Sequence, residues 1–223
     1  MAFNDSAVTR SSSSILETNK VLKNTYSLLS MTLVFSGIMA AISMVVNPPY
    51  IVSMISSIGA LVLIWFVIPR TANSSMGIFV VFLFTGLLGF GLGPILNQYM
   101  ALENGARIIS LSLAGTGIIF LGLSGYALTT KKDFSFLGGF LVAGMIMVII
   151  AAIANIFLGF SGLSLAISSI VIMIMSGFIL YDTSRIINGG ETNYIMATVG
   201  LYLSIYNIFV SLLHLLGALG GDD

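Results

Sequence analysis

Cysteine is absent from this chain of 223 residues, and charged residues make up only 7% of it. Without cysteine the chain can form no disulfide and no thiolate-ligated zinc, haem or iron–sulfur centre. A single histidine, His214, leaves no His-rich metal site. Eight Lys and Arg balance eight Asp and Glu, so there is no basic patch for nucleic acid. The sequence therefore predicts no resident cofactor, no metal centre and no nucleic-acid partner.

Apolar residues dominate what remains, at 57% of the chain, which is well above the usual share in soluble domains. A membrane-spanning helix needs about 20 predominantly apolar residues. Polar or turn-forming residues separate the apolar stretches, and no break is long enough for a soluble domain. We expect an all-α polytopic protein of the lipid bilayer, with seven spans near residues 26–46, 50–68, 76–96, 108–128, 134–158, 163–181 and 194–216.

The two ends of the chain are more polar than the middle. Residues 1–25 are Ser-rich and carry too little apolar surface to fold alone, so we expect a flexible tail there. The first apolar stretch is longer than the core of a signal peptide and follows a long polar segment, which predicts a retained span. The transmembrane domain is expected over 26–217, with a short tail at 218–223.

Lysine and arginine set the expected orientation, because cytoplasmic loops near span ends carry an excess of both. If the N-terminus is cytoplasmic, only Arg107 lies on the outer side. The C-terminus then lies on the outer face. The other seven cations share the cytoplasmic side: Arg10, Lys20, Lys23, Arg70, Lys131, Lys132 and Arg185.

Glycine is concentrated in the third and fourth spans, where Gly89 and Gly93 form a GxxxG motif. Small residues allow helix backbones to approach closely in lipid. The motif therefore favours tight helix packing over a broken helix that lines a cavity.

The last span carries small and polar residues on one helical face: Gly200, Ser204, Asn207, Ser211 and His214. A helix that faced only lipid could be apolar all round. The stripe therefore indicates a helix enclosed by the others, where the polar groups serve either inter-helix hydrogen bonds or the lining of a wet cavity.

Ser124 lies in a GLSG sequence similar to that around the nucleophile of an intramembrane serine protease, with His214 as the imaginable base. In the seven-span arrangement the two residues lie near opposite membrane faces, about 20 Å apart along the normal. A nucleophile and its base must approach to about 3 Å. We therefore expect no enzyme of this kind.

Asp182 interrupts an apolar run at the predicted end of the sixth span, with Arg185 one turn later and Arg70 on the same membrane face. The negative end of the helix dipole disfavours a carboxylate there, whereas the two cations favour it. One interpretation is a latch that gains or loses a proton near neutral pH. The other is a solvated Asp182–Arg185 ion pair worth about 0.3–0.5 kcal/mol.

Several segments together resemble one known family. They are KVLKNTYSLLS (20–30), LGPILNQY (92–99), LTTKKDFSFLGG (128–139), GFILYDTSRIINGGETNYI (177–195) and LYLSIYNIFVSLLHLLG (201–217). The chain resembles the Bax inhibitor-1, or transmembrane Bax inhibitor motif, family, and within it the bacterial YccA-type branch. The resemblance implies a bundle of seven helices with the seventh at its centre.

Channel members of that family leak Ca²⁺ through two acids that share a proton, with an arginine as latch. The resemblance places Asp182 at the first acid and Arg70 at the latch, while Ser204 stands where the second acid is expected. A hydroxyl cannot hold the second charge, so the coupled titration of two carboxylates is lost. A pH-sensitive Ca²⁺ leak along Asp182, Ser204 and Asn207 is therefore the alternative function.

The YccA-type branch implies a different role, because its members are bacterial inner-membrane proteins that bind the ATP-driven protease FtsH and restrain it. Such a protease pulls on an accessible cytoplasmic end. The polar N-terminal segment, with Arg10, Lys20 and Lys23, is the expected handle. A tight glycine-rich bundle behind it resists extraction from lipid. The first expectation is thus a non-enzymatic modulator of FtsH.

Overall fold

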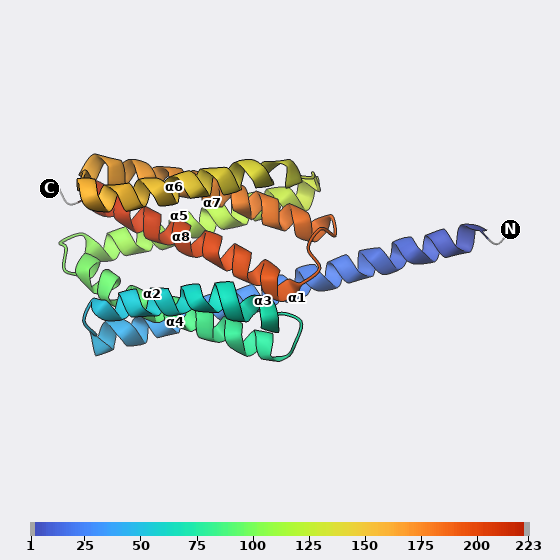
Figure 1. The fold of residues 1–223 in the computed structure, drawn as a ribbon, viewed down its shortest axis with the longest axis horizontal. Coiled ribbons are helices and arrows are strands. Elements are labelled where there is room, and N and C mark those ends of the chain that lie inside the picture. The colour runs from blue at the N-terminus through green and yellow to red at the C-terminus, as the bar shows by residue number, and fades with distance from the viewer. Residues whose placement is uncertain (1–2, 221–223) are drawn as a thin grey trace.

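The computed structural model describes residues 3–220 of the chain, with side chains from residue 16 on. All regular structure in this range is helical, which confirms the all-α prediction (Figure 1). The elements are α1 (Phe3–Val46), α2 (Ile51–Val62), the π-helix η1 (Leu63–Val67), α3 (Ile68–Thr71), α4 (Met76–Met100), α5 (Gly105–Thr130), the 3₁₀-helix η2 (Ser135–Leu137), α6 (Gly138–Leu158), α7 (Ser161–Ile187) and α8 (Tyr194–Gly220).

Within residues 3–220, seven helical stretches are long and apolar enough to cross a membrane, as predicted, and α2, η1 and α3 together make the second. Most helices run further than expected, and for two of them the extension changes a prediction. Helix α1 begins at Phe3, so the described part of the predicted tail is continuous with the first span. Helix α7 ends at Ile187, so Asp182 lies inside it rather than at its end. Parts of both predicted tails, residues 1–2 and 221–223, lie outside the described residues.

Local chemistry ends several helices where the sequence breaks occur. Asn47 and Lys131 adopt positive φ after α1 and α5, and Gly159 does so after α6. A left-handed residue at this position stops a helix and lets its amide satisfy a carbonyl of the last turn. The side-chain amide of Asn97 on α4 donates to the Met44 carbonyl at 3.0 Å and to Asn47 Oδ1 at 2.9 Å. The end of α1 is thereby tied to α4.

Helices α1 and α4 pack with their backbones unusually close. A Cβ added at Gly89 would lie 2.9 Å from the carbonyl carbon of Ser36, and one added at Gly93 would lie 2.7 Å from that of Ser43. Only glycine fits at these two positions without moving a backbone. The GxxxG motif is thus a helix-packing motif, as the first interpretation has it.

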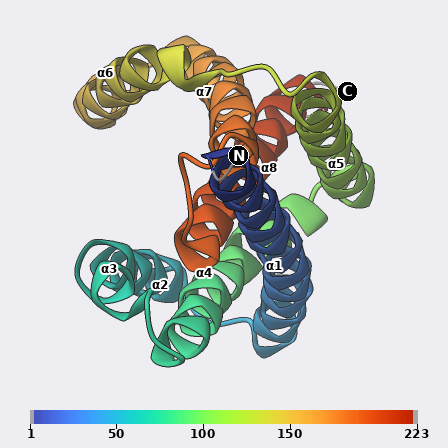
Figure 2. The ribbon, with the colours of Figure 1, turned by 90° about the vertical axis from the view of Figure 1, so that its right-hand side faces the viewer.

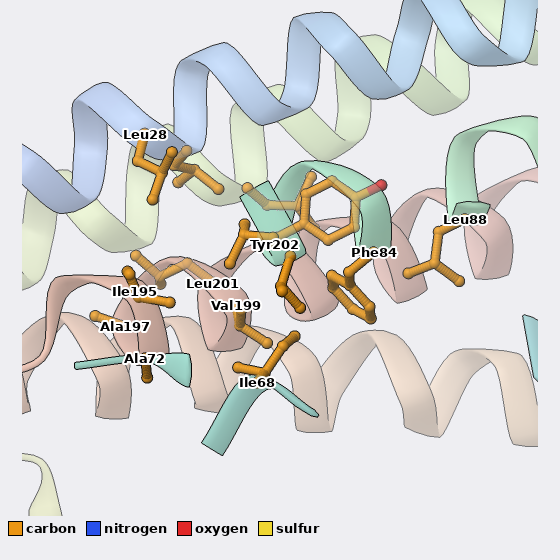
Figure 3. Packing of buried hydrophobic residues seen from close by; sticks show 14 of the residues in the cluster. Leu28, Ile68, Ala72, Phe84, Leu88, Ile195, Ala197, Val199, Leu201 and Tyr202 are labelled. Carbon is orange, nitrogen blue, oxygen red and sulfur yellow. The ribbon is translucent and has the colours of Figure 1, made fainter. Parts of the chain in front are cut away.

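Helix α8 runs through the centre of the bundle and packs against α1, α4, α5 and α7, whereas α2 packs on α4 and α6 packs on α7 at the outside (Figure 2). Residues of α8 belong to three hydrophobic clusters. In the largest, Tyr202 lies between α1 and α4 with Phe84 beside it (Figure 3). The Tyr202 hydroxyl lies 2.6 Å from Ser36 Oγ and donates to the Thr85 carbonyl at 3.3 Å. The central position of the last helix agrees with the polar stripe in its sequence.

Candidate functional site

Asp182 points toward the central helix. It lies on α7, five residues before Ile187, and faces Gly200 of α8. A Cβ at position 200 would lie 2.8 Å from Asp182 Oδ2. The absence of a side chain at Gly200 therefore makes the space that the carboxylate occupies.

The Asp182 side chain lines a cavity of about 690 Å³ bounded by α2, η1, α4, α6, α7 and α8. We call it the Asp182 cavity. Its volume is in the range of small-molecule sites. Apolar side chains form most of its wall, including Leu88, Met145 and Phe178. Its remaining polar members are Ser57, Tyr181, Arg185, Ser204, Tyr206 and Asn207.

One rim of the cavity lies on the outer surface of the bundle. Leu61 of α2, Trp65 of η1 and Ile149 of α6 line the cavity and are 57%, 74% and 50% exposed. All three belong to membrane-spanning helices. The cavity is therefore open sideways, between α2 and α6, toward the acyl chains of the bilayer.

Arg185 lines the same cavity but has other partners. Its guanidinium donates to the Gly190 carbonyl at 3.0 Å, lies 3.5 Å from Glu191 Oε2 and stands 5.5 Å from the centre of the Tyr181 ring. The Asp182–Arg185 ion pair considered from the sequence is not formed. Among residues 16–220, no cation forms a salt bridge with Asp182.

A second cavity of about 490 Å³ lies on the other side of α8, between α1 and α5. Its wall is almost wholly apolar, with Ser36, Thr116, Tyr202 and Tyr206 as the polar members. No charged residue lines it, so the Asp182 cavity is the better candidate for a functional site.

The chain matches a family model described as "Inhibitor of apoptosis-promoting Bax1" over residues 18–221. The chain belongs to the Bax inhibitor-1 family. It is similar to an uncharacterized membrane protein of Vibrio cholerae, with 53% identity over 93% of both chains. It is also similar to the modulator of FtsH protease YccA of Escherichia coli K12, with 51% identity over 94% of both. A second Escherichia coli relative of the same identity and coverage is called inner membrane protein YccA.

In this Bax inhibitor-1 family member one part of the polar stripe of α8 lines a cavity and another part makes an inter-helix hydrogen bond. Gly200, Ser204 and Asn207 border the Asp182 cavity. Ser204 Oγ donates to the Gly200 carbonyl at 3.2 Å, and Asn207 Nδ2 donates to the Leu203 carbonyl at 2.8 Å, so these groups bond within their own helix. Further along, His214 Nδ1 lies 2.8 Å from Ser168 Oγ and links α8 to α7.

The other predicted residues lie outside the cavity. Arg70 is exposed and donates to the Phe66 carbonyl of its own span at 3.1 Å, so it is not placed as a latch on Asp182. Lys20 borders a polar pocket between α1 and the α7–α8 connection, and Lys23 is exposed. The side chain of Arg10 lies outside the described residues.

Two features of the site were missed in the sequence. Glu191, and not Asp182, forms the ion pair with Arg185, and Trp65 lies at the mouth of the cavity. For the Arg185–Glu191 ion pair, the only signal in the sequence was the spacing of six residues across a Gly-Gly turn. Ser124 and His214 do not meet: Ser124 is hydrogen-bonded to Tyr26, and His214 to Ser168.

Proposed function

We propose that this chain is a non-enzymatic, multi-pass protein of the bacterial inner membrane that binds the membrane-anchored protease FtsH and restrains its proteolysis. The observation that carries the proposal is the 51% identity, over 94% of both chains, with a protein named for modulating that protease. The similarity covers the transmembrane bundle as well as most of α1. It therefore includes the α1–α4 contact that the mechanism below uses.

The distribution of cations supports a cytoplasmic N-terminus. Most of the cations lie at one end of the bundle, where α1 enters it, where α3, α5 and α7 end, and where α8 begins. They are Lys20, Lys23, Arg70, Lys131, Lys132 and Arg185. Arg107 lies at the opposite end, at the start of α5. The positive-inside rule puts the first of these ends in the cytoplasm and the C-terminus in the periplasm.

The shape of α1 supports a role as the handle. The helix extends beyond the other helices at its N-terminal end (Figure 1). Its membrane part is fixed to α4 by the contacts at Gly89 and Gly93. A protease that takes hold of the N-terminus must break these contacts before it moves the bundle. The chain is then a slowly extracted substrate that occupies the protease.

Co-purification from native membranes tests the proposal. We compare the full chain with a chain lacking residues 1–20 and with one in which Arg10, Lys20 and Lys23 are replaced by Gln. The full chain should co-purify with FtsH and slow the degradation of a second membrane substrate. Loss of residues 1–20 should lengthen its own half-life. Absence of co-purification for the full chain, or unchanged turnover without the tail, would contradict the proposal.

A cation leak is the second candidate, because the Asp182 carboxylate lies in a cavity beside Ser204 and Asn207. A serine at position 204 supplies no second carboxylate, so we expect the wild type to be inactive in Ca²⁺ uptake by liposomes. Ser204→Asp should gain uptake if the cavity is a pathway. Strong wild-type uptake that Asp182→Asn abolishes would place the leak ahead of the protease.

A further inference from the structure

One acidic side chain of the Asp182 cavity has no ion-pair partner among residues 16–220. Arg185 and Glu191 offset each other across 3.5 Å. Asp182 has no hydrogen-bond donor or cation among residues 16–220, although most of the wall around it is apolar. A carboxyl group in such surroundings stays ionised only when a donor or a counter-ion reaches it. The cavity is therefore complementary to a cation that comes from outside the chain.

One open side of the cavity faces the apolar part of the bilayer. Leu61, Trp65 and Ile149 form the rim, and they face the bilayer interior. A ligand that enters there passes through acyl chains, so it must have an apolar part. A positively charged group on an amphiphile satisfies both the charge and the route.

The depth of Asp182 agrees with a lipid headgroup. Helix α7 has 27 residues, which is about 40 Å, or roughly 10 Å more than the hydrocarbon core of a bilayer. Asp182 lies five residues, about 7.5 Å, from the end of this helix. If α7 is centred, the carboxylate lies within about 3 Å of the boundary between acyl chains and headgroups.

The wall of the cavity includes an irregular stretch of backbone. Ile64 and Trp65 line it and belong to the π-helix η1, with Pro69 shortly after. Pro69 has no N–H, so it cannot donate to the preceding turn, where Ile64 and Trp65 lie. Single π-turns inside helices occur often at functional sites.

We propose that the Asp182 cavity binds the primary ammonium headgroup of an aminophospholipid, phosphatidylethanolamine, which enters between α2 and α6 and pairs with the Asp182 carboxylate. Its acyl chains remain at the apolar rim formed by Leu61, Trp65 and Ile149. The inference stands apart from the protease, because it depends only on the contacts within the bundle.

Trp65 is the single tryptophan of the chain and stands at the cavity mouth, so it reports on the site directly. The chain is reconstituted into phosphatidylglycerol vesicles that contain dibrominated phosphatidylethanolamine, phosphatidylglycerol or phosphatidylcholine at matched mole fractions. Bromine quenches the Trp65 fluorescence on contact. We expect the apparent binding constant of the ethanolamine lipid to be about fivefold above those of the other two lipids. This ratio is the one expected for a single, partly screened charge contact. The comparison with phosphatidylcholine tests whether binding needs N–H donors, since the quaternary ammonium of that lipid has none.

Asp182→Asn keeps the side-chain shape and removes the charge, and it should abolish the fivefold preference. Asp133→Asn is the matched control, because Asp133 lies at the same end of the bundle but outside the cavity, bonded to the Ser135 amide. It should keep the preference. Equal quenching by all three lipids in the wild type would overturn the proposal, and so would a preference that survives in Asp182→Asn. Displacement of the lipid by free ethanolamine would show a site for soluble amines and would overturn it as well.

Discussion

Replacing Gly93 by alanine tests whether the α1–α4 contact depends on close backbone approach. The added Cβ would lie 2.7 Å from the Ser43 carbonyl carbon, about 0.7 Å inside ordinary van der Waals contact. No rotamer change relieves a clash with backbone, so the two helices must separate. Overpacking of this kind costs about 1–3 kcal/mol. The helix preference of alanine returns at most about 1 kcal/mol, which leaves a net loss of stability of up to about 2 kcal/mol.

The measurement is unfolding by SDS in mixed micelles, followed by circular dichroism. Gly122→Ala is the matched control, because an added Cβ on that part of α5 meets no atom within 4 Å. It should be neutral or slightly stabilising, while Gly93→Ala shifts the midpoint to less SDS. If extraction limits turnover, the same variant should also be degraded several-fold faster in cells. Equal midpoints for the two variants would refute the packing argument.

Three further predictions follow from other contacts. Gly200→Ala puts a methyl group 2.8 Å from Asp182 Oδ2; it should displace the carboxylate and weaken the preference of Trp65 quenching for the ethanolamine lipid, and an unchanged preference would contradict the facing geometry. Lys131→Cys and Arg107→Cys are single labelling sites in a cysteine-free chain; an impermeant maleimide should label only Arg107→Cys in intact spheroplasts, and the reverse pattern would invert the proposed orientation. Asn97→Ala removes two hydrogen bonds to the end of α1 and should cost about 1–2 kcal/mol in the SDS assay, whereas an unaltered midpoint would show that they contribute nothing.

The number and order of the spans could be predicted because apolar length is a local property of the chain. The helix ends were less accessible. Nothing between Tyr181 and Ile187 stops a helix, so α7 continues through Asp182. The sequence-based prediction ends this helix at residue 181 because it treats the carboxylate of Asp182 as the stop signal. Gly200, on another helix, makes room for that carboxylate, and such a contact has no trace in local periodicity.

The ionic partners were predicted less well than the fold. Sequence spacing brings Arg185 within one turn of Asp182, yet the turn at Gly189, which has positive φ, brings Glu191 back onto Arg185. The cavity likewise depends on which helices touch. Its mouth exists because α2 packs on α4 and α6 packs on α7, leaving part of α8 uncovered between them. The α8 stripe was compatible with such a lining but did not indicate which helices would border it.

The continuity of α1 from Phe3 to Val46 has a mechanical consequence. With no joint between the protruding part and the part in the bundle, there is no slack to take up when the first residues are pulled. The load runs along the helix axis, parallel to the line of close contacts with α4. Contacts arranged in this way bear force together, as in shear, instead of parting one after another as in a zipper. A motor acting on the N-terminus would then have to overcome them nearly all in one step.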